Sequence, residues 1–249
     1  LITSIKSITS ILTSPFDFEN KYSQIYKEIS KLLPMDGMFL GLYLKENSLL
    51  HLIFIMNENQ RFPEVTIPVE SRIEKEALTK RRPVLKNNIK QSLNYLNNNH
   101  KVVRSTLAAP LIYRDQVIGL VSLQNYTSNV YLETHLEFLS LISGFITLDV
   151  INFILTKARE IEKNALKQLQ KVSHELTQPL TGITGYCNLI REEISKDDPF
   201  FREISDMEEQ ALRLEKLIQK VQMTVHLNHS EIAKNNPYLN LLKILQLDE

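Results

Sequence analysis

The 249-residue sequence is poor in cysteine and glycine and carries no excess of charge. Its one cysteine, Cys187, excludes a disulfide framework and is typical of a cytoplasmic protein. Lysine plus arginine and aspartate plus glutamate both number 29, so the net charge is zero. Without a basic surplus, nothing indicates nucleic acid or an anionic membrane as a partner. We therefore expect a cytoplasmic protein that binds no nucleic acid.

Long uninterrupted apolar runs are also missing. The stretch from Phe138 to Leu155 is mostly apolar but includes Asp149 and Asn152. An Asp at the centre of a membrane costs about 2.5–3.5 kcal/mol, so a buried helix of a soluble domain explains the stretch better than a membrane span. No signal peptide is visible, and because the first residue is Leu we expect a piece of a longer protein.

Metal ligands are scarce as well. His226 and His229 lie three residues apart near a predicted helix end, but no third ligand lies nearby, so we expect no metal site. His51, His100 and His135 are lone histidines, which are more often structural than haem ligands.

Residues 16–155 mix strand and helix patterns and predict an α+β domain. Two apolar strands, Met38–Leu44 and Leu49–Met56, are separated by a short turn. Two longer strands, Ser105–Tyr113 and Gln116–Gln124, form a hairpin that turns at residues 114–115. Further expected elements are a helical stub at 1–15, a helix from Tyr22 to Leu32, strands at Glu64–Val69 and Pro83–Lys86, and a helix opened by the capping box Ser71-x-x-Glu74.

A long helical pattern runs from near Tyr131 to about Ser195, roughly 95 Å at 1.5 Å per residue. Asp198 and Pro199 suit the start of a second helix, and so short a loop makes the two helices antiparallel. The apolar seam of such a hairpin would be exposed, so we expect two copies to pair as a dimeric four-helix bundle with coiled-coil packing. The seam positions on the first helix are Ala158, Ile161, Ala165, Leu169, Val172, Leu176, Leu180, Ile183, Cys187, Ile190 and Ile194.

The most informative stretch is residues 172–183, Val-Ser-His-Glu-Leu-Thr-Gln-Pro-Leu-Thr-Gly-Ile. His174 lies two residues from the seam positions on either side, so it should be an exposed imidazole. Gln178 lies one turn further along the same face, and Glu175 follows the histidine directly. Pro179 removes a backbone donor in mid-helix, which predicts either a static kink or, as we favour, a hinge.

This run resembles the H-box of sensor histidine kinases of two-component systems, whose usual form is Ser-His-Glu-Leu-Arg-Thr-Pro-Leu. Thr177 stands in place of the Arg and Gln178 in place of the Thr or Asn. The resemblance to this HisKA-type dimerisation and phosphotransfer domain covers about residues 160–227. The alternative is an ordinary surface histidine on an amphipathic helix.

The segment before it resembles a GAF domain, a small-molecule sensor fold with a central antiparallel sheet. The resemblance is carried by Arg104–Gln124, with small residues before Pro110 and a glycine at 119, and by the helix that follows. Between Val69 and Arg82 the family often has a Gly-rich turn, and this sequence has none. The pocket gives no indication of a ligand, so the GAF ligand is unknown.

The H-box resemblance implies roles for four residues. His174 would be the phosphoacceptor, and Glu175 would act as general base and fix the tautomer of the imidazole. Gln178 would orient the water that dephosphorylates a response regulator, and Pro179 would be the helix hinge. ATP and Mg²⁺ would belong to a catalytic domain that is missing here, so no cofactor is expected in this chain.

We therefore expect the sensory and phosphoacceptor portion of a sensor histidine protein kinase, a phosphorelay protein inactive by itself. The predicted organisation is a stub at 1–15, a GAF-like domain at 16–155, a HisKA-like hairpin at 156–229 and a tail at 230–249. Expected partners are a second copy, an ATP-binding catalytic domain in cis or trans, and a response regulator receiver domain. The alternatives are a non-catalytic GAF dimer that binds a ligand or partner, and a stand-alone histidine phosphotransfer protein.

The first prediction concerns nucleotide. No glycine follows Gly185, whereas the family's ATP-binding domain needs Gly-rich phosphate loops, so the chain should not bind Mg-ATP. Isothermal titration calorimetry tests this, and a saturable heat of binding would contradict it.

Overall fold

The computed structural model describes residues 2–15, 17–69, 73–92, 102–227 and 236–245. The chain divides into two compact units. Residues 1–155 together with 236–249 form the first, called here the sheet unit, and residues 156–235 form the second, the hairpin unit.

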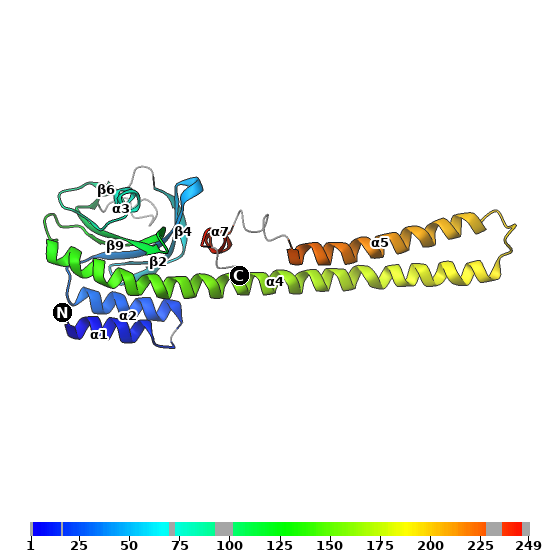
Figure 1. Cartoon of the computed structure of the whole chain (residues 1–249), viewed down its shortest axis with the longest axis horizontal. Helices are drawn as coiled ribbons and strands as arrows, with labels where there is room; N and C mark the ends of the chain where they lie inside the picture. The colour runs from blue at the N-terminus through cyan, green and yellow to red at the C-terminus, as the bar shows by residue number, and fades with distance from the viewer. Residues whose placement is uncertain (1, 16, 70–72, 93–101, 228–235, 246–249) are drawn as a thin grey trace. The chain divides into compact units, whose positions relative to one another are not determined.

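The sheet unit is built on one antiparallel sheet with the strand order β3-β2-β1-β9-β8-β5, and β4 also pairs with β2 (Figure 1). A two-stranded ladder of β6 and β7 lies apart from it. The strands are β1 Gly37–Leu44, β2 Leu49–Asn57, β3 Gln60–Phe62, β4 Val65–Pro68, β5 Val84–Lys86, β6 Gln91–Ser92, β7 Val102–Val103, β8 Ser105–Tyr113 and β9 Gln116–Asn125. The predicted central antiparallel sheet is therefore confirmed.

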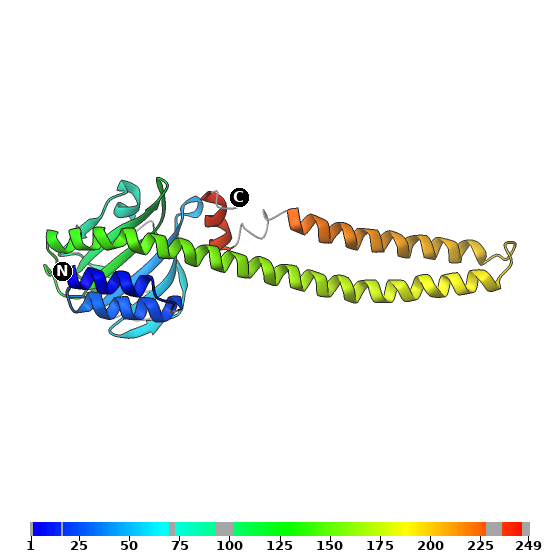
Figure 2. The same cartoon turned by 60° about the horizontal axis from the view of Figure 1, so that its bottom comes forward.

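Helices cover both faces of this sheet (Figure 2). Helix α2 (Phe18–Ser30) and the first part of α4 (Glu133–Glu193) cover one face, and α3 (Glu74–Lys80) covers the other. Helix α1 (Ile2–Leu12) packs against α2 and buries Ile8 and Leu12. The stub expected at 1–15 is thus part of the sheet unit, because α2 offers its apolar residues a partner within the same chain.

The hairpin of β8 and β9 turns at Arg114 and Asp115, with φ angles of 44° and 61°. Two consecutive residues with positive φ give a turn whose twist matches the strands. Beyond the turn, Gly119 of β9 pairs with Leu42 of β1. A Cβ atom on Gly119 would lie 2.2 Å from the carbonyl oxygen of Gly41, so only glycine allows this approach of the two strands.

Helix α4 is attached to the sheet unit by apolar and charged contacts. Ile142, Ile146, Val150 and Ile154 are fully buried at steps of four, the spacing of one helix face. Lys21 of α2 donates to Asp149 at 2.6 Å, so the Asp149 that interrupts the apolar stretch is one partner of an ion pair.

By length and apolar composition α4 could also cross a membrane, but half of its most apolar window is buried within the protein. The core helix of a soluble domain meets the same description, and the four buried residues above favour that interpretation.

After the hairpin unit the chain contributes a last helix, α7 (Pro237–Ile244), to the sheet unit. Asn236 caps it by accepting from the amides of Tyr238 and Leu239. The hydroxyl of Tyr238 donates to Glu64 at 3.3 Å, and its ring meets that of Phe153 edge-on. Burial raises the pKa of Tyr238 well above its usual value. The predicted tail is therefore anchored on the sheet unit through an aromatic residue.

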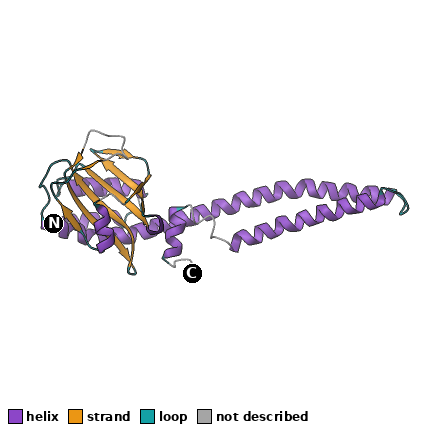
Figure 3. Ribbon diagram, turned by 90° about the horizontal axis from the view of Figure 1, so that it is seen from above, coloured by secondary structure: helices purple, strands orange, loops and turns teal. Residues whose placement is uncertain are grey.

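The hairpin unit consists of the second part of α4 and the antiparallel α5 (Phe201–Leu227) (Figures 1 and 3). Cys187 of α4 and Ala211 of α5 are both buried, and Arg191 forms an ion pair with Glu208 across the two helices. In the connecting turn Asp198 accepts from the amide of Phe200 at 2.8 Å, but α5 begins at Phe201 and not at the predicted Pro199, so Asp198 orders the turn before the helix. The predicted helical hairpin is confirmed.

One local prediction differs from the structure. Glu74 is the first residue of α3 rather than its third, and its carboxylate accepts from Ser122 and Gln124 inside the sheet unit. A carboxylate used in this way does not close a capping box, and Ser71 lies outside the described residues. The strand β3 and the ladder of β6 and β7 were not predicted, because they are only two or three residues long.

The second prediction compares two glycines. Gly119→Ala should destabilise the protein by about 1–3 kcal/mol, because the added Cβ meets backbone. Gly144→Ala is the matched control: nothing lies within 4 Å of its Cβ, and a helical glycine replaced by alanine gains about 0.5–1 kcal/mol. Urea unfolding followed by circular dichroism measures both, and equal stabilities would refute the close approach of β1 and β9.

Candidate functional site

The run singled out in the sequence lies on the surface of α4 in the hairpin unit. His174, Glu175, Gln178 and Pro179 are exposed, whereas Ser173 is only 6 % exposed. Ser173 lies on the side of α4 that packs toward α5, and each further residue turns about 100° around the helix. His174 is therefore at the edge of the contact between the two helices, where a second molecule can reach it.

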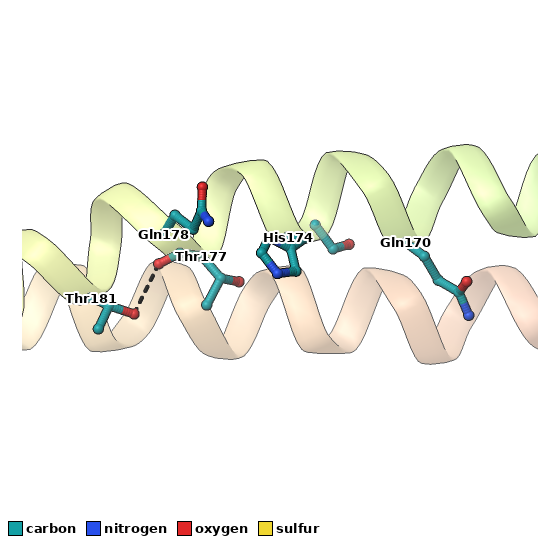
Figure 4. Close-up of a pocket in the computed structure, with 6 residues that line it drawn as sticks. Gln170, His174, Thr177, Gln178 and Thr181 are labelled. Carbon is teal, nitrogen blue, oxygen red and sulfur yellow. Dashed lines mark hydrogen bonds between the residues drawn. The ribbon is translucent and has the colours of Figure 1, made fainter.

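A groove of about 520 Å³ surrounds this histidine (Figure 4). In Figure 4 the imidazole of His174 projects on the side of α4 that faces α5, whereas the amide of Gln178 turns away from it. His174 is the only ionisable group among the described lining residues. These residues are Gln170, Ser173, His174, Thr177, Gln178 and Thr181.

Hydroxyl and amide groups dominate that lining, and they can donate hydrogen bonds to phosphoryl oxygens. No carboxylate lines the described part of the groove, so a negatively charged phosphoryl group would meet no like charge there. The groove can therefore accommodate an anionic group next to the imidazole of His174.

Glu175 is paired with a cation rather than with the histidine. Its carboxylate lies 3.7 Å from the ammonium of Lys171, one helical turn earlier. Among the described contacts there is no hydrogen bond between the Glu175 carboxylate and the His174 ring. Both side chains are well exposed, so this pair contributes little to stability, and Glu175 is free to reorient.

Helix α4 continues through Pro179, but its local backbone bonding is altered. Proline lacks the amide that would bond the carbonyl of Glu175. The hydroxyls of Thr181 and Thr184 donate to carbonyls one turn earlier, at 3.0 and 2.9 Å, an arrangement that often bends helices. Gly182 and Gly185 follow, and a Cβ on either would meet nothing within 4 Å. No packing constraint requires glycine at these two positions, so their effect is to weaken the helix after the histidine.

The hairpin keeps a large part of its apolar surface uncovered. Cys187 is buried between α4 and α5 and Leu180 is half-buried, but Leu176 and Ile183 of α4 are 47 % and 41 % exposed. On α5, Leu214 and Leu217 are 51 % and 50 % exposed. These exposed side chains form an apolar stripe along the two-helix hairpin.

The sheet unit holds a separate buried polar cluster. Glu74, which is fully buried, accepts from Ser122 Oγ at 3.3 Å and from Gln124 Nε2 at 3.2 Å. Thr106 and Ser122 share a further bond of 3.2 Å. This network connects the start of α3 to strands β8 and β9.

The lone histidines of the sheet unit have structural partners where they are described. His51 contacts Thr66 Oγ1 at 2.9 Å and Glu64 Oε2 at 3.2 Å, and the hydrogen bond from His51 lowers the pKa of Glu64. His135 accepts from the amide of Leu132 at 3.3 Å. In the described part of the chain no three His, Cys, Asp or Glu residues group as metal ligands. His100, His229 and the side chain of His226 lie outside it.

Two residues beside His174 were not singled out from the sequence. Gln170 lies one turn before the histidine and Thr181 two turns after it, and both line the groove. Spacings of four and seven place residues on one helix face, so this periodicity could have found them.

Two known families match separate segments of the chain, one in the sheet unit and one in the hairpin unit. Residues 17–150, more than half of the chain, match the family described as GAF domain. Residues 165–227 match the His Kinase A (phospho-acceptor) domain, HisKA, which includes His174. A search of curated proteins gave no match.

Solved structures resemble the sheet unit. The GAF domain of a phosphoenolpyruvate-protein phosphotransferase (ptsP) from Coxiella burnetii is 13% identical, with a TM-score of 0.53, and the match covers 63% of this chain and 96% of that one. The nlh2 GAF domain of A. Aeolicus in an inactive state is 18% identical, with a TM-score of 0.47, over 60% and 94% of the two chains. At such identities the likeness concerns the fold alone.

The third prediction concerns the helix at Pro179. Pro179→Ala restores a backbone hydrogen bond and should stabilise the hairpin by up to about 3 kcal/mol, with a higher melting temperature by circular dichroism. Gly185→Ala, further from the histidine, should gain only about 0.5–1 kcal/mol. Unchanged melting of the Pro179→Ala protein would show that α4 is not weakened there.

Proposed function

The chain belongs to the GAF domain family and carries a His Kinase A (phospho-acceptor) domain behind it, and on this premise we propose that it is the sensory and phosphoacceptor portion of a two-component sensor histidine kinase. His174 is the phosphoacceptor in this proposal. The observation that carries it is the exposed imidazole within a matched phospho-acceptor domain, beside a groove lined by neutral hydrogen-bond donors.

The proposed reaction is a transfer of the γ-phosphoryl group of ATP, held with Mg²⁺ by a catalytic domain in cis or in trans. An unprotonated nitrogen of the His174 ring attacks the γ-phosphorus, a nitrogen–phosphorus bond forms, and the bond to the leaving oxygen of ADP breaks. The group then passes to an Asp carboxylate of a response regulator. Imidazole suits both steps because its neutral form is nucleophilic near pH 7.

Two neighbours of His174 have positioning roles in the proposal. Glu175 offsets the positive charge that develops on the ring and holds its other N–H, which requires the carboxylate to leave Lys171. The amide of Gln178 orients a water toward the aspartyl phosphate of the regulator, since an amide both donates and accepts.

Pro179 and the glycines after it provide the movement that a sensor needs. The helix is weakened directly after the histidine, so a modest change in α4 can alter how far His174 is exposed. The GAF domain influences that change because α4 is also part of its core. The uncovered apolar stripe of the hairpin is closed by a second copy, which makes the working unit a homodimer.

The fourth prediction tests the phosphoacceptor. With Mg-ATP and an active catalytic domain of a related kinase supplied in trans, the chain should acquire an acid-labile, base-stable phosphoryl group, and His174→Ala should abolish it. His135→Ala, a histidine of the sheet unit, is the matched control and should keep full labelling. Labelled His174→Ala protein would rule out this residue as the acceptor.

The fifth prediction distinguishes the roles of Glu175 and Gln178, the two neighbours of His174. Glu175→Gln should slow phosphorylation, because it removes charge but keeps shape. Gln178→Ala should leave phosphorylation intact and slow dephosphorylation of the regulator, since only that step needs the amide. Both side chains are exposed, so neither change should cost more than about 0.5 kcal/mol in urea unfolding. If Gln178→Ala left regulator dephosphorylation unchanged, this residue would have no part in that step.

A further inference from the structure

The last helix of the chain, α7, lies in a site to which several elements of the sheet unit contribute. The ring of Tyr238 meets the ring of Phe153 of α4 edge-on, with centres 5.6 Å apart, and that of His51 of β2 at 5.8 Å. Its hydroxyl donates to Glu64, between β3 and β4, at 3.3 Å, and His51 Nε2 lies 3.2 Å from the same carboxylate oxygen. Helix α7 also packs against β1. The site is therefore composite, because the sheet and α4 each supply a part of it.

Helix α7 depends on this docking for its fold. It has eight residues, Pro237–Ile244, and isolated helices shorter than about 12–15 residues are marginal in water. Its stability comes instead from apolar burial, since Tyr238, Leu239, Leu241 and Leu245 are each at most 7 % exposed. Loss of any part of the site would therefore release α7 and unfold it at the same time.

The site also depends on how α4 packs on α2. Phe153 contacts Tyr238 and stacks on Phe18 of α2, with ring centres 3.8 Å apart. One turn earlier on α4, Asp149 pairs with Lys21 of α2 at 2.6 Å. Small shifts of packed helices are a common form of conformational change. A shift of α4 along α2 would move the ring of Phe153 relative to Tyr238.

Within the hairpin unit, His174 lies opposite the end of α5. Arg191 of α4 forms an ion pair with Glu208 of α5, which sets the register of the two antiparallel helices. Followed along both helices, this register puts His174 opposite Val225, in the last turn of α5 before it ends at Leu227. Figure 4 shows the imidazole on the side of α4 that faces α5. The groove at the phosphoacceptor therefore lies beside the last turn of α5.

A short stretch of chain connects this last turn of α5 to α7. Residues 228–235 join Leu227 to Asn236, the capping residue of α7. A chain of this length spans at most about 30 Å when it is fully extended. Docked α7 therefore holds the end of α5 on a short tether. Helix ends are among the parts of a fold that open most readily, so such a tether acts where α5 is weakest.

We propose that α7 is a releasable strap that restrains the last turn of α5 and thereby limits access to His174. When α4 shifts on the sheet unit, Phe153 moves away from Tyr238, α7 leaves its site, and the end of α5 opens beside the groove. The inference rests on the proposed function and adds its regulation. The sheet unit acts on the phosphoacceptor through the end of α5 as well as through α4.

Hydrogen–deuterium exchange of the full chain, read by mass spectrometry, tests the strap. Tyr238→Ala removes both the ring and the hydroxyl, so amide exchange should rise severalfold in α7 and at the end of α5. Exchange at the beginning of α5 and in β8 and β9 should stay unchanged, which also shows that both units remain folded. Tyr186→Ala, at an exposed tyrosine of the hairpin, is the matched control and should alter neither α7 nor α5. Faster exchange in α7 alone, or in neither helix, would overturn the inference.

Two further variants separate docking from restraint. A flexible Gly-Ser segment inserted between residues 229 and 230 lengthens the tether but leaves the α7 site intact. The end of α5 should then exchange faster while α7 stays protected. Phe153→Leu keeps an apolar side chain but presents no ring edge to Tyr238, so it should release α7 as Tyr238→Ala does. If α7 stays protected in Phe153→Leu, α4 is not part of the site and the inference is wrong.

Transfer of phosphoryl groups to His174 in trans tests the regulation. Tyr238→Ala and the longer tether should each raise the initial rate of labelling severalfold, and Tyr186→Ala should leave that rate unchanged. An unaltered rate in variants whose α5 exchanges faster would overturn the inference. If the unaltered chain acquires no label on His174, the proposed function fails, and the exchange measurements still decide whether α7 restrains α5.

Discussion

The structure depends on the burial of one face of α4 in the sheet unit. Ile142, Ile146, Val150 and Ile154 are removed from water there, and full burial of such a side chain contributes about 1.5–3 kcal/mol. Lys21 and Asp149 add an ion pair whose two side chains are about one-tenth exposed. Because breaking such a buried pair leaves an uncompensated charge, rotation of α4 away from α2 is costly. The helix that carries His174 is therefore firmly fixed at its beginning.

Helix α4 is firmly attached to the sheet unit at its beginning, but the helix is weak around His174. From Thr177 to Gly185 the backbone loses a donor at Pro179, gains two hydroxyl bonds to its carbonyls and includes two glycines that no packing requires. Elements that move in regulation are drawn from the least stable parts of a fold. In the function proposed above, this combination of a rigid anchor and a weak segment is what directs small changes in the sensor domain to the histidine.

The return of the chain to the sheet unit adds a second connection. Tyr238 of α7 contacts Glu64, His51 and Phe153, and Phe153 belongs to α4 and stacks on Phe18 of α2 at 3.8 Å. The segment after the phospho-acceptor hairpin therefore shares aromatic contacts with the anchored part of α4. A change in how α4 packs on the sheet unit would also alter the contacts of α7, because Phe153 of α4 contacts both Phe18 of α2 and Tyr238 of α7.

Periodicity in the sequence determined the long helix, the hairpin, the β8–β9 turn and an exposed His174, because these follow from local spacing and from residues such as Asp198 and Arg114. The H-box run likewise identified the phospho-acceptor domain without a structure. Tertiary structure alone decided the rest. It assigned Glu74 to a buried network instead of a helix cap and Asp149 to an ion pair with Lys21. It also brought α1 onto α2 and Tyr238 onto Glu64. These contacts join residues far apart in the chain, so no local pattern encodes them, and the partner of a buried charge is known only once the elements have packed.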